Sequence, residues 1–202
     1  MSAPISAVPL EAGGVALEPV REAHREDLRS AAADPAIWAH MPYAPLGEAF
    51  DPWFDEVLRI DAAGVEAAWM ARTVQDGKVV GSTRFLAIVA AHRRVEIGHT
   101  WYVPAVWASL VNPACKFALM TYAFEILGLN RVELKTDIRN LRSQAAIAKL
   151  GATREGVFRA HMVRPDGSLR DSVYFSVIAS DWPRVRDGLR ARLAVAAKKE
   201  QA

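Results

Sequence analysis

The sequence predicts one mixed α/β (α+β) domain with a single sheet flanked by helices. Three observations support this prediction. Long strand-like stretches are interrupted by single helical ones, which favours one mixed sheet over two domains. The chain has 202 residues, a usual length for one domain. Hydrophobic residues make up 51% of it, which supports a core and excludes a disordered chain. We expect a flexible leader at 1–14, the domain at 15–181, and a C-terminal helix and tail at 182–202.

Local signals place the elements within that domain. Runs rich in β-branched and aromatic residues predict strands, whereas asparagine, proline and glycine mark helix ends. The turns Asp76-Gly77 and Pro165-Asp166-Gly167 predict two hairpins. In chain order we expect a strand at Val15–Val20, helices at Arg21–Ala33 and about 52–63, strands at Ala67–Val74, Lys78–Val89 and Val95–Tyr102, a helix ending at Leu127, a strand at Arg131–Asp137, a helix at Leu141–Leu150, strands at Val157–Val163 and Leu169–Ile178, and a helix from Trp182 to about Lys199.

Prolines break up the segment 34–54, so a loop is expected there. Its large side chains have two interpretations, since they can line a pocket for a substrate or cover the core. These side chains are Trp38, His40, Met41, Tyr43, Phe50, Trp53 and Phe54.

The stretch Val95–Leu127 organises the chain as a strand, a short loop and a long helix. Asn112 is the expected N-cap of that helix and Pro113 its first residue. Unpaired N–H groups at a helix start attract anions, so the loop before Asn112 is a candidate anion site. Alternation along the strand predicts Val95, Ile97, His99 and Trp101 on one face and Glu96, Gly98, Thr100 and Tyr102 on the other.

The composition argues against several classes of partner. Lys and Arg number 25 against 23 Asp and Glu, so no basic field predicts binding to nucleic acid or to a membrane. No apolar run approaches the ~18 residues of a membrane span, and the N-terminus does not resemble a secretion signal. The single cysteine, Cys115, fits an inert core position in a cytoplasmic protein. No metal site is predicted, because no ligand spacing links cysteines or carboxylates to His24, His40, His92 and His161.

Four stretches share their order and spacing with a known family. They are Glu96-Ile97-Gly98-His99, the loop and helix start Trp107–Lys116, the run from Asn140 and Ser143 to Ala152, and Arg164–Gly167 with the following strand and Asp181-Trp182-Pro183. Together they resemble the GCN5-related N-acetyltransferase (GNAT) superfamily, in the branch of ribosomal-protein N-terminal acetyltransferases. The resemblance covers roughly Gly14 to Val185. It implies a twisted, mostly antiparallel sheet, splayed between its central strands, with a bulge near Gly98.

The resemblance also implies a binding mode for acetyl-CoA, the acetyl donor. The pantetheine arm would lie along the central strand like an added strand, and the diphosphate would bind the loop after it. The family's loop commonly starts with Gln or Arg and has Gly at the fourth position, where this chain has Trp107 and Leu110. The implied cofactor-binding residues are Trp101, Tyr102, Val103, Trp107, Ala108, Ser109, Leu110, Val111, Asn112, Asn140 and Ser143.

Amide formation from a thioester requires a base for the amine, donors for the oxyanion and an acid for the leaving thiolate. The resemblance favours Glu96 as the base; the alternative is a structural glutamate paired with a cation such as Arg94. Ser143 matches a serine near the CoA sulfur, or is simply a polar residue in a first helical turn. Asn140 contacts the pantetheine amides, caps its helix, or does both.

The expected function is therefore acetyl transfer from acetyl-CoA to a primary amine. The acceptor is either a small molecule or the N-terminus of a peptide or protein, and a homodimer is compatible with the family. One alternative is a degenerate GNAT-fold module that binds acyl-CoA or a protein without catalysis, suggested by the loop that lacks glycine. Another is an unrelated α/β binding module, in which the strands holding Glu96 and Glu133 would not separate.

Overall fold

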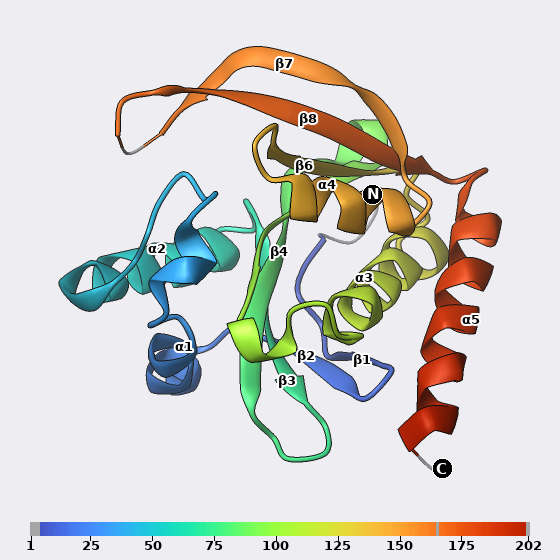
Figure 1. The fold of residues 1–202 in the computed structure, drawn as a ribbon, viewed down its shortest axis with the longest axis horizontal. Helices are drawn as coiled ribbons and strands as arrows, with labels where there is room; N and C mark the ends of the chain where they lie inside the picture. Colours follow the sequence, from blue (N-terminus) through green and yellow to red (C-terminus); the bar gives the residue numbers. More distant parts are fainter. Residues whose placement is uncertain (1–4, 165, 201–202) are drawn as a thin grey trace.

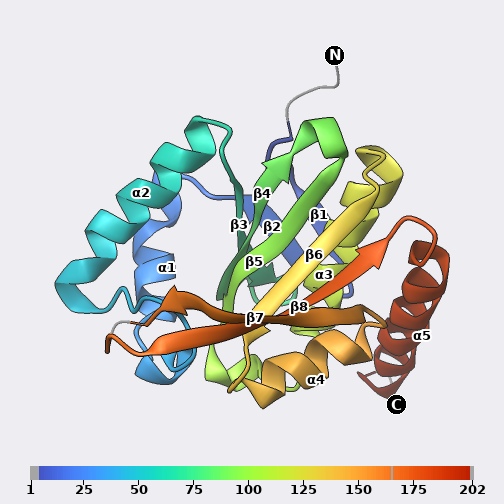
Figure 2. The same ribbon diagram turned by 90° about the horizontal axis from the view of Figure 1, so that it is seen from above.

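Eight strands form one sheet through the domain. The computed structural model describes residues 5–164 and 166–200, with side chains of the last helix described only as far as residue 195. The strands are β1 (Leu10–Ala12), β2 (Val15–Pro19), β3 (Ala67–Thr73), β4 (Val79–Val89), β5 (Arg94–Tyr102), β6 (Arg131–Asp137), β7 (Thr153–Val163) and β8 (Leu169–Ile178). Their order is β1-β2-β3-β4-β5-β6-β8-β7, and all neighbours are antiparallel except β5 and β6, which are parallel (Figure 2). The expected mixed, mostly antiparallel sheet is confirmed.

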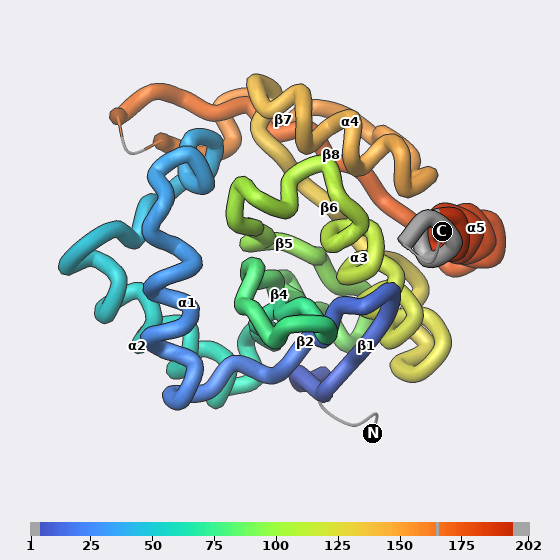
Figure 3. Tube along the Cα trace, turned by 60° about the horizontal axis from the view of Figure 1, so that its bottom comes forward, coloured from blue at the N-terminus to red at the C-terminus, as the bar shows by residue number. Residues whose placement is uncertain are grey.

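Helices cover both faces of this sheet (Figures 1 and 3). The α-helices are α1 (Arg25–Ala31), α2 (Phe50–Ala62), α3 (Val111–Thr121), α4 (Leu141–Lys149) and α5 (Trp182–Glu200). A π-helical turn, Tyr122–Ile126, continues α3, and short 3-10 turns lie at Glu22–His24, Pro35–Trp38, Gly47–Ala49, Ala90–His92 and Pro104–Val106. The helices α1 and α2 cover one face, and α3, α4 and α5 cover the other.

Each face has its own hydrophobic core. The larger core joins the sheet to α3, α4 and α5, with fully buried side chains such as Trp69, Phe85 and Leu119. The smaller core joins the other face to α1 and α2. It contains much of the aromatic segment 34–54, because Trp38, Phe50 and Phe54 are buried there, whereas Tyr43 and Trp53 are only partly covered. Most of these aromatic residues therefore cover the core.

The expected elements are present, with shifts at their ends of the size usual for such boundaries. The largest shifts are in β7, which begins at Thr153 rather than Val157, and in α1, which begins at Arg25 rather than Arg21, after a 3-10 turn. Leu10–Ala12 fall inside the expected leader yet pair with β2, so the ordered domain begins earlier than residue 15. Residues 1–4 of that leader and Pro165 of the last predicted turn lie outside the described residues.

The expected start of α3 is wrong. The helix begins at Val111, with Leu110 at the N-cap position, so Asn112 and Pro113 lie inside its first turn. Proline is tolerated there because the first N–H groups of a helix have no intrahelical acceptor. The cap-like hydrogen bond comes from Ser109, whose Oγ accepts from the Val111 N–H at 3.2 Å.

Candidate active site

The two central strands pair only at their beginnings. Arg94–Glu96 of β5 align with Arg131–Glu133 of β6, and no pairing follows. β6 nevertheless stays paired with β8 to its end at Asp137, and β5 stays paired with β4 as far as Tyr102. The facing edges of β5 and β6 therefore separate after Glu96. This separation, which we call the splay, is the one that the family resemblance implies, and it rules out the unrelated α/β module.

A bulge in β5 lies at the splay. β5 carries one extra residue relative to β4 between Gly98 and Trp101, and His99 has a positive φ of 48°. The extra residue reverses the alternation of faces beyond it. Val95 and Ile97 lie in the core under α3, as expected, but Trp101 lies in the core under α1 and α2. Strict alternation is thus wrong for His99, Thr100, Trp101 and Tyr102.

The bulge also decides which main-chain groups of β5 face the splay. The Val103 N–H donates to the Val80 carbonyl of β4 at 2.9 Å. Hydrogen-bonding directions alternate along a strand, so the main-chain groups of Thr100 and Tyr102 point the other way, toward the splay. These two residues can bind an extended ligand as an added strand would.

The loop between β5 and α3 closes one end of the splay. The Trp107 indole Nε1 donates to the Tyr102 carbonyl at 2.8 Å, and the Arg142 guanidinium of α4 stacks 3.7 Å from the Trp107 ring centroid. Ala108 has a φ of 61°, a left-handed conformation that favours glycine. The loop thus makes a glycine-like turn without glycine, and it leads into the α3 N-terminus, where N–H groups and the helix dipole favour an anion.

The start of α4 lies across the splay from this loop. The Asn140 side chain caps the helix, because its Oδ1 accepts from the Ser143 N–H at 2.9 Å. The predicted N-cap is therefore confirmed. Ser143 is partly buried in the first turn, next to Arg142, which contacts Trp107.

Substitutions at Asn140 separate its cap from a role in ligand binding. Asn140→Asp retains the cap acceptor, whereas Asn140→Ala removes it and is expected to lower the free energy of unfolding by about 1 kcal/mol. If the amide also donates to the pantetheine arm, both variants raise the KM for acetyl-CoA. Urea unfolding together with steady-state kinetics checks this, and an unchanged KM in Asn140→Asp would leave only the cap.

Glu96 sits at the vertex of the splay, on the face of α1 and α2. Its side chain is 5% exposed, and its Oε2 accepts from the Lys135 Nζ of β6 at 3.2 Å. Burial raises the pKa of Glu96, although the Lys135 ammonium opposes that shift. Arg94, one of the cations expected to pair with Glu96, binds Glu133 instead. Glu96 is thus ion-paired, and its burial makes it more basic than an exposed glutamate.

Two tyrosine–histidine pairs lie on the same face. The Tyr43 hydroxyl and His99 Nδ1 are 2.7 Å apart, and the Tyr174 hydroxyl lies 3.5 Å from His161 Nε2. Burial lowers the pKa of His99 to about 3, so its imidazole is neutral at physiological pH. The Tyr43 hydroxyl satisfies the His99 side chain, and the left-handed backbone of His99 belongs to the bulge.

Comparison with known proteins identifies the family. A family model described as an acetyltransferase (GNAT) domain matches residues 15–153. The chain belongs to the GNAT family. It is 30% identical over 122 residues to YdaF of Bacillus subtilis (strain 168), a candidate ribosomal N-acetyltransferase by name; the match spans 60% of this chain and 63% of YdaF.

Solved structures share the GNAT fold. A GCN5-related N-acetyltransferase from Brucella melitensis superposes with a TM-score of 0.87 at 27% identity, covering 95% of this chain and 87% of that one. Mycobacterium smegmatis RimJ, solved in complex with CoA-disulfide, has a TM-score of 0.78 at 20% identity, covering 95% and 97%. These likenesses extend over almost the whole chain.

Sequence reasoning about this GNAT chain misses Thr100 and Lys116 as residues beside the splay. Lys116 carries a signal that could have revealed it, since a lysine interrupts the apolar helix residues Cys115 and Ala118. Thr100 carries no such signal, because its position depends on the bulge. Its partnership with Lys116 is a contact between β5 and α3.

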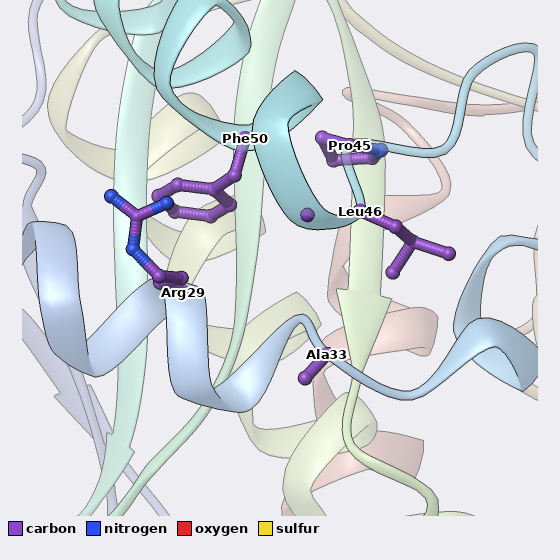
Figure 4. A pocket seen from close by; sticks show the side chains of 6 residues that line it. Arg29, Ala33, Pro45, Leu46 and Phe50 are labelled. Atoms are coloured by element: carbon purple, nitrogen blue, oxygen red, sulfur yellow. The ribbon is translucent and has the colours of Figure 1, made fainter.

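Two open hollows are lined by none of the predicted site residues. One, of about 310 Å³, lies between α1 and the turn before α2, where the Arg29 guanidinium is 4.6 Å from the Phe50 ring (Figure 4). The other, of about 360 Å³, lies over the paired starts of β5 and β6 and includes Tyr174. In the described ranges no group of three or more histidine, cysteine or acidic side chains is placed to hold a metal ion. None of the described helices combines the length and apolarity needed to cross a membrane.

Proposed function

We propose that this chain transfers the acetyl group of acetyl-CoA to a primary amine at the splay. The observation that carries the proposal is the unpaired edge of β5, with the main chain of Thr100 and Tyr102 facing the opening. A helix N-terminus at the end of that edge adds an anion site. Membership of the GNAT family supplies the chemistry that such an arrangement supports.

Acetyl-CoA would lie between β5 and α4. The pantetheine arm would bind the edge of β5 near Trp101–Val103, where the Thr100 main chain and the Tyr102 N–H face the splay. The Tyr102 carbonyl is already taken by the Trp107 indole. The diphosphate meets the loop Trp107–Asn112 and the first turn of α3. The Arg142 guanidinium lies over the Trp107 ring, and its side chain is exposed, so its N–H donors are available to a phosphate. RimJ of Mycobacterium smegmatis, which shares the fold, has been solved with CoA-disulfide.

The reaction is a direct attack on the thioester. Glu96 takes a proton from the ammonium group, directly or through water, and the freed nitrogen lone pair forms the C–N bond. The carbonyl π electrons move to oxygen, where a main-chain N–H of Thr100 or Tyr102 stabilises the oxyanion. Collapse of that intermediate breaks the C–S bond, and the thiolate takes a proton from the Ser143 hydroxyl or from solvent. The attacking nitrogen loses its second proton to solvent, or to the Ser143 oxygen, which restores the hydroxyl and leaves the neutral amide.

The acceptor would approach from the face of α1, α2 and the β7–β8 hairpin, because Glu96 points to that face. Tyr43 and Trp53 are partly exposed there. YdaF is named for a ribosomal substrate, which favours the N-terminus of a peptide or protein over a free small amine as the acceptor of this chain.

Titration calorimetry with acetyl-CoA tests the proposed binding site. The wild-type chain should bind, and Ser109→Asp should weaken binding about tenfold or more, because its carboxylate repels the diphosphate at the α3 N-terminus. Ala105→Asp is the control, an equally exposed position earlier in the loop. Equal affinities in the two variants would contradict the site. No heat at about 1 mM acetyl-CoA would exclude the enzyme and favour a module that binds only a protein.

A further inference from the structure

Lys116 is a buried lysine in the middle of the larger core. It lies on α3, is 4% exposed, and has the buried Cys115 beside it. Moving an ammonium group out of water is costly unless a carboxylate or several acceptors compensate it. Nothing in the packing of an apolar helix face requires a charge at this position.

The contacts of Lys116 lead directly to the bulge. Its Nζ donates to the Thr100 Oγ1 at 2.9 Å, and it forms no ion pair with a carboxylate in the described part of the chain. The Thr100 hydroxyl in turn lies 2.7 Å from the Thr83 Oγ1 of β4 and 3.4 Å from the Gly98 carbonyl. One ammonium group therefore holds a small set of hydroxyls that spans β4 and both sides of the bulge.

Thr100 is the residue through which this network reaches the splay. It follows His99, whose left-handed backbone forms the bulge, and its own main-chain groups point to the unpaired edge. Its side chain projects out of the plane of the sheet, toward Lys116 of α3. Thr100 alone therefore connects the Lys116 side chain to a main-chain N–H group at the splay.

We propose that Lys116 is a positioning residue of the transfer reaction, which holds the Thr100 main-chain N–H toward the thioester carbonyl oxygen by fixing the Thr100 side chain from behind the sheet. The inference rests on the proposed function of the splay. As negative charge develops on that oxygen, a donor already held in place stabilises it without reorganisation. The buried ammonium adds a positive charge behind the same strand.

The charge state of Lys116 fits this role. Burial lowers its pKa to about 8, so the ammonium form predominates at neutral pH. The neighbouring ionisable groups are Cys115 on the same helix and Tyr102 on β5. Both are neutral there, because burial raises the pKa of Cys115 to about 11 and that of Tyr102 further. No neighbouring anion on these elements offsets the charge.

Isotope-edited infrared spectroscopy of bound acetyl-CoA, labelled at its carbonyl carbon, tests the inference together with kinetics. Lys116→Met should leave the affinity for acetyl-CoA and the KM nearly unchanged, raise the carbonyl stretching frequency of the bound thioester, and lower kcat at least about tenfold. Thr100→Val should behave similarly, since it removes the hydroxyl that connects the Lys116 ammonium group to the Thr100 main chain. Thr83→Val is the matched control, which removes a neighbouring hydroxyl and leaves the link between Lys116 and Thr100.

The outcomes separate this inference from the proposed function. Binding of acetyl-CoA by every variant, with the same carbonyl frequency and kcat as the wild type, would overturn the inference alone. A loss of kcat in Lys116→Met accompanied by a lower melting temperature would also overturn it, in favour of a structural role. Failure of the wild-type chain to bind acetyl-CoA would overturn the proposed function and the inference with it.

Discussion

Glu96→Gln is expected to lower kcat for acetyl transfer by about 100- to 10,000-fold, the usual contribution of a general base. Glutamine keeps the shape of the side chain and can still accept a hydrogen bond from Lys135, so the fold should persist. The affinity for acetyl-CoA should change little, because the donor lies along β5 and Glu96 acts on the amine. Steady-state assays of thiol release, with calorimetry of acetyl-CoA binding, measure both quantities.

The control for this variant is Glu133→Gln. Glu133 is the direct partner of Glu96 across the paired start of β5 and β6, and it too forms ion pairs, with Arg94 and Arg131. The Glu133→Gln variant should retain acetyl-transfer activity. Because burial raises the pKa of Glu96 and the base must be ionised, kcat should rise with pH through that raised pKa. This acid limb should vanish in Glu96→Gln, and its persistence would assign the base to another residue.

Lys116→Met is expected to make the protein more stable. Burial lowers the pKa of Lys116 from 10.5 to about 8, and at about 1.4 kcal/mol per pKa unit this amounts to a penalty on the order of 3 kcal/mol at pH 7. Methionine removes the buried charge at similar length. The loss of the hydrogen bond to Thr100 lowers the stability of the variant by about 1 kcal/mol. The expected net increase in the free energy of unfolding is therefore roughly 2 kcal/mol.

The pH dependence of that gain checks its cause. Between pH 8 and 10.5 the unfolded chain binds the Lys116 proton and the folded chain has released it, so wild-type stability rises with pH across this window. The advantage of Lys116→Met should be full below pH 8 and fade toward pH 10.5. Urea unfolding at several pH values measures it. A variant that is less stable than the wild type at pH 7 would show that the ammonium group stabilises the fold.

Local sequence signals were enough to predict most of the helices and strands, and also the N-cap of α4 beside the site. Asn140 caps α4, and Gly151, just beyond the end of that helix, has a positive φ. Both signals are local in the sequence, and both predictions are confirmed. The separation of the central strands followed from the family resemblance and not from local pattern. No periodicity in Val95–Tyr102 indicates where its neighbour leaves it.

The features that escaped prediction depend on single residues and on long-range contacts. One extra residue at His99 reverses the faces of Trp101 and Tyr102, and a bulge of this kind has no obligatory sequence signal. α3 begins at Val111, earlier than expected, because the Ser109 Oγ accepts a hydrogen bond from its first N–H group. The expected acceptor was the side chain of Asn112. The Lys135 partner of Glu96 lies on the next strand, so only the sheet register reveals it.

The most direct test of the central claim is a thiol-release assay with acetyl-CoA against a panel of amines and peptides bearing free N-termini. The wild-type chain should release CoA in step with acetylated acceptor for at least one member, fastest with a peptide N-terminus. Acetyl-CoA binding by calorimetry with no thiol release from any acceptor, at any pH between about 6 and 9, would contradict an enzymatic role for the splay and leave a binding module in its place.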